Sequence, residues 1–514
     1  MSGPPNQQAT VFDKLTPTQQ VLAGFVLSLA NLTVILDLTI ANVSVPHISG
    51  NLGITPSQGT WVISSYAVAE AICVPLTGWL TMRFGAVKIF CLSMFGFGLC
   101  SLMCGLSFNL SMLILFRIGQ GICGAPLMPI SQALLMRIFP PEKRAAAMTS
   151  WTMTVLVGPA LGPILGGYIS DTWSWHWIFF INVPIAAACV FAAMAILPPV
   201  ETPILKRRVD RVGLALLVFW IGCLQIMLDT GREHDWFADP MIVALAIGAA
   251  IGFVVFVIWE LTDDHPIVDL RIFRHRGFTS TVITLSLCFG AYFASIVIIP
   301  QWMQLSLGYS ATQAGIATAM TAMAALVTSM LIARHLQKFD PRIIMCIGVA
   351  WLGLMALWRA NYWSSESAFW VLALPQFIQG FGMPLFMVPL TMLSLGSVDP
   401  DETASAAGLQ NFMRTMSVAI STSVVLTMWE GSQRVSQTDL AGKLNTDQTL
   451  RAMEQAGYTL EQSRRAIGQM VGQQAMSLSM NHIFVIAAAI LFFCAILVWM
   501  APRPKAPAGP GGAH

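Results

Sequence analysis

Long, almost entirely apolar stretches restrict the fold of this chain more than any other feature. A helix needs about 20 mostly apolar residues to cross a bilayer, and only helices and closed barrels satisfy their backbone groups in lipid. The stretches are continuous and lack the ten-residue alternation of barrel strands. We therefore predict an all-α membrane protein with fourteen spans, near residues 20–44, 60–81, 88–106, 111–131, 145–169, 177–197, 212–230, 240–261, 279–304, 313–333, 343–360, 367–392, 404–428 and 482–501.

Charge and cysteine content argue against several other classes of protein. Only 10% of the residues are charged, against about 25% in a soluble domain, and the net charge of +2 indicates no nucleic-acid partner. The ten cysteines lie in apolar stretches without metal-ligand spacing, as expected of small buried hydrophobes. No Ser-His-Asp, metal or nucleotide motif is present, so we predict neither an enzyme nor a bound cofactor.

Basic residues predict the orientation of the helices. Of the 27 lysines and arginines, eighteen fall on the side of the N-terminus, and the cytoplasmic side carries this excess. The opening segment also lacks the pattern of a signal peptide, so we expect both termini in the cytoplasm. The predicted parts are a cytoplasmic segment, an N-terminal half, a linker with two extra spans, a C-terminal half and a disordered tail: 1–19, 20–200, 201–278, 279–501 and 502–514.

Two parts of the chain resemble each other at an offset of about 260 residues. Gln120-Gly121, followed by Pro129, matches Gln379-Gly380, followed by Pro389. Parallel repeats of this kind are typical of transporters whose binding cavity lies between the halves; the alternative is chance similarity between apolar helices. We predict two six-helix halves plus two additional central spans.

The long segment 429–481 lies on the outer side in this arrangement. It is polar and rich in glutamine, and we expect its stretch 446–476, which has few helix breakers, to be helical. It is either a solvated linker or a docking surface for a periplasmic partner.

Charged residues within spans are functional candidates by default. Asp37 shares a small, polar helix face with Thr33, which we expect to line a cavity; the alternative is a carboxylate reaching interfacial water. Glu70 lies in the middle of its span, where burial disfavours the charged form, so it either carries a proton or bonds a neighbouring helix. Arg117 shares a face with Gln120 and needs a partner, for which Asp37 and Glu70 are the candidates.

The second half has its own polar face on span 404–428. Gln410, Asn411 and Arg414 follow this face, which serves either the substrate and proton path or helix–helix hydrogen bonding. Asp229, near the end of a central span, is a secondary functional candidate or an interfacial cap.

Span 145–169 combines glycines and prolines in register. Gly158-Pro159, Gly162-Pro163 and Gly166-Gly167 repeat every four residues. The glycines form a smooth face for close helix packing, and the prolines bend the helix. We expect this helix to lie at the interface where the halves move.

These motifs resemble those of the major facilitator superfamily, and within it the fourteen-span drug:proton antiporters of the EmrB/QacA type. The resemblance covers nearly the whole chain. It rests on Leu36–Pro46, on Arg117 with Gln120-Gly121, on the glycine–proline repeat, on Trp175–Pro184, and on Gln225–Asp229 with Asp235–Phe237. It implies export driven by proton entry and links the Arg117 motif to proton transfer. From the residues themselves, we expect proton binding at Asp37 or Glu70 to weaken the pairing with Arg117 and to shift the halves between two states.

One loop departs from the superfamily pattern. Gly78, Arg83 and Gly85 are kept, but Met82 stands where the family has an acidic residue. A latch built on that acid is therefore in doubt, and Arg83 is expected to cap a helix C-terminus, where a cation is favoured.

The resemblance implies multidrug efflux, with the proton as coupling ion, from the inner membrane of a two-membrane bacterium. The substrates would be amphipathic or lipophilic toxic compounds. The implied partners are a periplasmic membrane-fusion adaptor of the EmrA type and an outer-membrane channel of the TolC type. Export of a defined metabolite, fatty acid or siderophore on the same scaffold is the alternative, and a membrane enzyme or sensor lacks any supporting motif.

Overall fold

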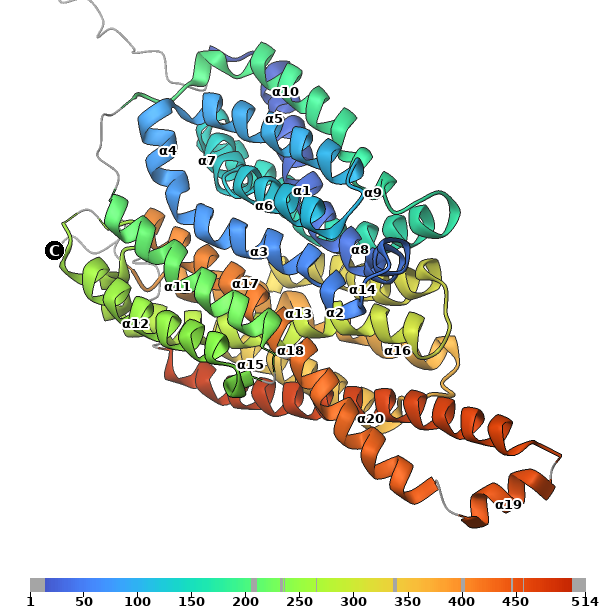
Figure 1. Cartoon of the computed structure of the whole chain (residues 1–514). Helices are drawn as coiled ribbons and strands as arrows, with labels where there is room; N and C mark the ends of the chain where they lie inside the picture. The colour runs from blue at the N-terminus through green and yellow to red at the C-terminus, as the bar shows by residue number, and fades with distance from the viewer. Residues whose placement is uncertain are drawn as a thin grey trace, which may run out of the picture.

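The computed structural model shows a bundle of long helices (Figure 1). Every regular element in the described residues is a helix, and twelve of these helices are long and apolar enough to cross a membrane. The chain is therefore a multi-pass, all-helical membrane protein. The described residues are 14–204, 210–231, 234, 236–264, 266–335, 340–398, 403–444, 447–455 and 457–501.

The N-terminal half begins with a helix whose ends the sequence defines. Thr16 and Gln19 form a capping box with Pro17 in the first turn, and the helix ends at Gly53, whose positive φ favours glycine. The half consists of α1 (Pro17–Leu52), α2 (Pro56–Gly59), α3 (Trp61–Cys73), α4 (Thr77–Phe84), α5 (Ala86–Gly105), α6 (Leu110–Gly124), α7 (Leu127–Ile138), α8 (Pro141–Thr172), α9 (Trp177–Phe180) and α10 (Asn182–Ile196).

A central pair and a second half follow. The central pair is α11 (Arg211–Thr230) and α12 (Pro240–Thr262), each begun by an aspartate that caps the backbone. The second half consists of α13 (Arg276–Leu305), α14 (Ala311–His335), α15 (Pro341–Tyr362), α16 (Phe369–Gly380), α17 (Gly382–Leu395), α18 (Thr403–Leu444), α19 (Asp447–Gln455) and α20 (Leu460–Leu497).

Two further helices, α8 and α18, are not among the twelve counted as membrane spans. They have 32 and 42 residues, which at about 1.5 Å per residue is enough to cross a bilayer. They correspond to the predicted spans 145–169 and 404–428.

The two halves meet along specific helices. α8 packs against α1 in its own half and against α14 in the other half, and α3 packs against α18. The central pair α11 and α12 packs together, and α11 contacts both α3 and α18. The central pair is therefore attached where the halves join (Figure 1).

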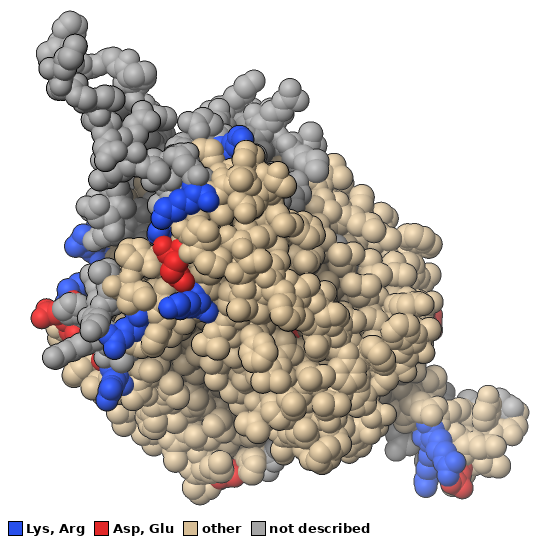
Figure 2. Space-filling model, turned by 90° about the horizontal axis from the view of Figure 1, so that it is seen from above, with Lys and Arg blue, Asp and Glu red and all other residues tan. Residues whose placement is uncertain are grey.

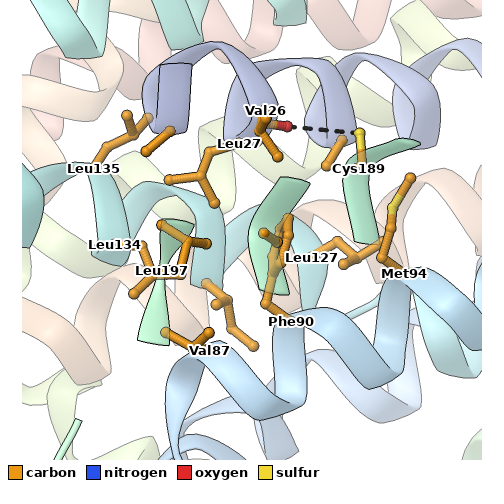
Figure 3. Close-up of a cluster of buried hydrophobic side chains, with 14 of the residues drawn as sticks. Val26, Leu27, Val87, Phe90, Met94, Leu127, Leu134, Leu135, Cys189 and Leu197 are labelled. Atoms are coloured by element: carbon orange, nitrogen blue, oxygen red, sulfur yellow. Dashed lines mark hydrogen bonds between the residues drawn. The ribbon is translucent and has the colours of Figure 1, made fainter. Parts of the chain in front are cut away.

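Each half has its own apolar core. In the N-terminal half, buried side chains of α1, α5, α7 and α10 interlock, as Figure 3 shows around Leu27, Phe90 and Leu127. The Cys189 thiol contacts the carbonyl oxygen of Val26 at 3.9 Å within this core. All ten cysteines are free thiols.

The segment 429–481 forms a helical hairpin beyond the bundle. We expected a polar outer segment that is helical over 446–476, and α19 and the start of α20 lie there. The span before it was expected to end near residue 428, but α18 continues to Leu444, and the helices form a projection that Figure 1 shows at the lower right. Figure 2 shows charged residues near one end of the molecule and near the tip of this hairpin, with a wide, almost uncharged surface between them.

Candidate functional site

An ion pair is enclosed within the N-terminal half. The Arg117 Nη1 atom lies 2.6 Å from Asp37 Oδ2, and the two side chains are 1% and 0% exposed. Arg117 Nε also donates to the carbonyl oxygen of Val62 at 2.8 Å, and its guanidinium lies 4.4 Å from the centre of the Tyr66 ring. The predicted need of Arg117 for a carboxylate is thus met by Asp37.

Three further polar side chains complete this network. Asp37 Oδ1 accepts hydrogen bonds from Gln120 Nε2 at 2.9 Å and from Asn182 Nδ2 at 2.8 Å. Ser101 in turn accepts from Gln120 and Asn182. A buried charge is tolerated only when it is paired and hydrogen-bonded, and these donors fulfil that requirement.

A cavity of about 200 Å³ lies between the halves. It is bordered by α1, α3 and α7 of the first half and by α13, α14, α17 and α18 of the second. Most of its wall is apolar and includes the side chains of Val34, Leu38, Met128, Phe289, Phe293, Met383 and Met387.

Glu70 and Arg414 are the charged residues in the described lining of this cavity. They come from different halves, on α3 and α18, and each lies within electrostatic range of the other. Glu70 is also within range of Arg117 and Asp37. The cavity carboxylate is therefore electrostatically linked to the enclosed ion pair.

The structure separates the other predicted cavity residues from this chamber. Asp37, Thr33 and Gln120 are buried inside the first half and are not part of the cavity lining. Gln410 and Asn411 lie on α18 beside Arg414 but also outside the lining. The cavity face of α1 instead carries Val34, Ile35, Leu38 and Thr39.

The glycine repeat of α8 serves two interfaces. A Cβ atom added at Gly158, Gly162 or Gly166 would fall on Ile35, Thr39 or Ile40 of α1. A Cβ at Gly167 would fall on the carbonyl oxygen of Ala311, in the other half. Pro163 is just as close to α14, because a Cβ at Gly315 would meet its carbonyl oxygen. The side chain of Pro159 lies outside the described residues.

One residue of the loop motif, Gly85, lies against a carboxylate that the sequence did not indicate, that of Glu201. Arg83 lies in the last turn of α4, and Gly85 follows with a φ of 95°. Glu201 accepts hydrogen bonds from the backbone N–H groups of Val87 and Lys88 at 2.9 and 3.1 Å. An acid distant in sequence thus caps the start of α5. Gly78 has open space around it.

Asp229 belongs to a polar contact that joins the central pair to both halves. It accepts hydrogen bonds from Ser64 of α3 at 2.8 Å and from Gln225 one turn earlier on α11 at 2.9 Å. Gln225 also donates to Ser423 of α18. This places Asp229 at a junction of three helices.

A second carboxylate, that of Asp171 at the C-terminal end of α8, joins the two halves. Asp171 accepts hydrogen bonds from the backbone N–H groups of Thr312 and Ala311 at 2.7 and 3.2 Å, and His47 Nε2 lies 3.2 Å away. Partial burial raises the pKa of Asp171, but hydrogen bonds from Thr312, Ala311 and Ser310 outweigh it and leave the pKa below its ordinary value.

Comparison with known proteins agrees with this arrangement. The sequence pattern of the Major Facilitator Superfamily matches residues 27–422. The chain is 44% identical to the multidrug export protein EmrB of Escherichia coli (strain K12) over 506 residues, covering 97% of this chain and 99% of that protein. It is 40% identical to the fatty acid resistance protein FarB of Neisseria gonorrhoeae over 495 residues, covering 95% and 96%.

A solved structure of a POT family transporter in complex with a thioalcohol-conjugated peptide has the same fold. Its TM-score is 0.64 at 14% sequence identity, over 95% of this chain and all of that one. At that identity the similarity concerns the fold alone. The sequence pattern, the relatives and the fold agree: the chain belongs to the Major Facilitator Superfamily, in the branch of the EmrB multidrug export proteins.

Proposed function

We propose that this protein is a proton-coupled exporter of amphipathic or lipophilic toxic compounds. The supporting observation is the chamber between the halves, whose apolar wall contains the carboxylate of Glu70 and the guanidinium of Arg414. Methionine and aromatic side chains adapt to varied apolar ligands. A carboxylate inside an apolar chamber can exchange a proton with water when the chamber opens. The near-full-length similarity to EmrB supports the same function.

In this proposal, Glu70 exchanges the proton and the Asp37–Arg117 pair transmits the change to the bundle. Tyr66 connects the two sites, because it lies one turn before Glu70 on α3 and under the Arg117 guanidinium. A proton on Glu70 alters the field at Arg117, which is held by Asp37. The Gly167–Ala311 contact then provides the surface on which the halves move.

The proposed setting is the inner membrane of a two-membrane bacterium. α8 and α18 complete fourteen spans, both termini lie in the cytoplasm, and the 429–481 hairpin extends into the periplasm. Its projection beyond the bundle supports docking of a membrane-fusion adaptor of the EmrA type, which would connect to an outer-membrane channel of the TolC type.

Susceptibility of an efflux-deficient host to a panel of drugs tests this function. Wild-type protein, expressed with its adaptor, should raise resistance to several unrelated lipophilic drugs. An uncoupler, which collapses the proton gradient, should abolish efflux as measured by drug accumulation in the cells. Asp37→Asn should remove the resistance, whereas Glu366→Gln, at an exposed position, should keep it. Unchanged resistance with Asp37→Asn at equal expression would contradict the proposal.

The alternative is export of one defined compound, such as a metabolite, fatty acid or siderophore. The similarity to FarB favours a fatty acid among these. A single saturable substrate in the same panel, with no protection against the others, would support this alternative.

A further inference from the structure

The charges that line the central cavity specify what charge its ligand must carry. We propose that the cavity binds amphipathic zwitterions, whose anionic group is held by Arg414 and whose cationic group competes with the proton for Glu70. This inference rests on the proposed proton-coupled export and adds a substrate class and a specificity-determining residue to it.

Arg414 lacks an anionic acceptor in the described structure. Its one hydrogen bond among the described residues goes to the Met128 sulfur at 3.1 Å, and its guanidinium lies 5.9 Å from the centre of the Phe289 ring. A guanidinium has five N–H donors, and a thioether is a weak acceptor. Carboxylates match its planar fork better than any other side-chain group. The unused donors therefore favour an anionic group on the ligand.

Glu70 lacks a cationic partner in direct contact. No ion pair or side-chain hydrogen bond joins it to another described residue, although Arg414 lies within electrostatic range. A ligand amine can therefore reach Glu70 without displacing a side-chain partner. Because an amine and a proton both need the same carboxylate, binding of one excludes the other, as exchange transport requires.

Charge balance selects a zwitterion over a simple ion. With Glu70 ionised, the charges of Glu70 and Arg414 cancel, and the remaining titratable group in the described lining is the phenol of Tyr292. A ligand with net charge would leave that charge uncompensated in an apolar chamber, which is costly. A zwitterion keeps the sum at zero. A simple anion would instead be balanced only with Glu70 protonated, so that proton and ligand would move together.

Four forms of one scaffold test this proposal in proteoliposomes with an imposed pH gradient: norfloxacin, its methyl ester, its N-acetyl derivative and the doubly blocked compound. Wild-type protein should transport norfloxacin with the highest kcat/KM. Arg414→Gln should lower that value by about tenfold to a hundredfold, as expected for a lost charge-assisted hydrogen bond. The ester is a cation without a carboxylate, and removal of Arg414 leaves its charge balanced by Glu70. Transport of the ester should therefore be kept or should increase, which shows that the variant is folded.

Two further variants sharpen the result. Arg414→Lys should restore part of the norfloxacin transport, and Arg359→Gln, which removes a buried cation of the same half outside the cavity lining, should leave the order of the four compounds unchanged. Equal losses for all four compounds with Arg414→Gln, or a preference for the N-acetyl anion, would overturn the inference. If a lipophilic dye is transported but none of the four compounds is, the zwitterion inference is wrong while the proposed export function stands. If the dye is not transported either, the proposed export function is wrong as well.

Discussion

The two halves share a scaffold but treat their buried arginines differently. In the first half, Arg117 pairs with Asp37, which Gln120 and Asn182 also contact. In the second half, Arg359 is equally buried, but among the described residues it has no carboxylate partner. Its Nη1 donates to Gln376 at 2.9 Å, and its guanidinium lies 4.8 Å from the Phe484 ring centre.

The internal repeat shows how this difference arises. An offset of 259 residues relates Gln120-Gly121 to Gln379-Gly380, and the same offset places Gln376 opposite Arg117. The second half thus has an amide where the first has a guanidinium, and its arginine comes from α15 instead. We infer that the first half is specialised for proton chemistry, while the second provides fixed positive charge and apolar wall.

The largest expected effect comes from breaking the ion pair. Asp37→Asn keeps the shape of the side chain but leaves Arg117 as an uncompensated buried charge, which should cost about 3–5 kcal/mol of stability. Denaturant unfolding in detergent measures this loss. The double variant with Arg117→Gln should regain much of the stability while remaining unable to couple transport to protons. Additive losses in the double variant would show that the two residues act independently.

Next in size is the contact between the halves at α8. Gly167→Ala places a Cβ against the backbone of Ala311, which cannot move aside as a flexible side chain would. We expect about 1–3 kcal/mol of destabilisation, as for overpacking, and a greater loss in transport rate. Gly408→Ala, where nothing lies within 4 Å of the added atom, is the matched control. Similar transport by both variants would contradict an interface role for Gly167.

A smaller effect is expected at Asp171, which caps α14 from the other half. Asp171→Asn should cost about 1 kcal/mol, because an exposed cap is screened by solvent. The pKa of Asp171 is lowered in the folded protein, so its contribution is complete above the ordinary aspartate pKa of about 3.9 and is lost as the pH falls further. Unfolding midpoints of wild type and variant should therefore converge in acid. A constant difference across this range would argue against the cap.

The smallest effect should come from Arg359. Because no described carboxylate is left unpaired when it is removed, Arg359→Gln should change stability by about 1 kcal/mol or less: the lost hydrogen bond to Gln376 is offset by removal of a buried charge. Proton-coupled transport should persist. If this variant destabilises the protein as much as Arg117→Gln does, the contrast between the halves is wrong.

Sequence patterns predicted the helices well, since lipid leaves a chain few alternatives. They also predicted that Arg117 needs a partner, because a buried guanidinium cannot lose its proton. They did not indicate Ser101, whose type is ordinary in membrane helices, nor Glu201, which is 114 residues from the backbone it caps. Asn182 belongs to the motif Trp175–Pro184, but its hydrogen bond to Asp37 was not predicted. The side of α1 that faces the cavity was also not predictable, because a small, polar face suits an enclosed network as well as a chamber.

Glu70 is the group that we propose exchanges a proton for substrate, and transport by Glu70→Gln in proteoliposomes tests this role directly. Two rates of a lipophilic dye are measured: uptake driven by a pH gradient, and exchange of internal for external dye without a gradient. We predict that the variant loses the driven uptake but keeps the exchange, while Glu366→Gln keeps both. Driven uptake at the wild-type rate in Glu70→Gln would contradict the account.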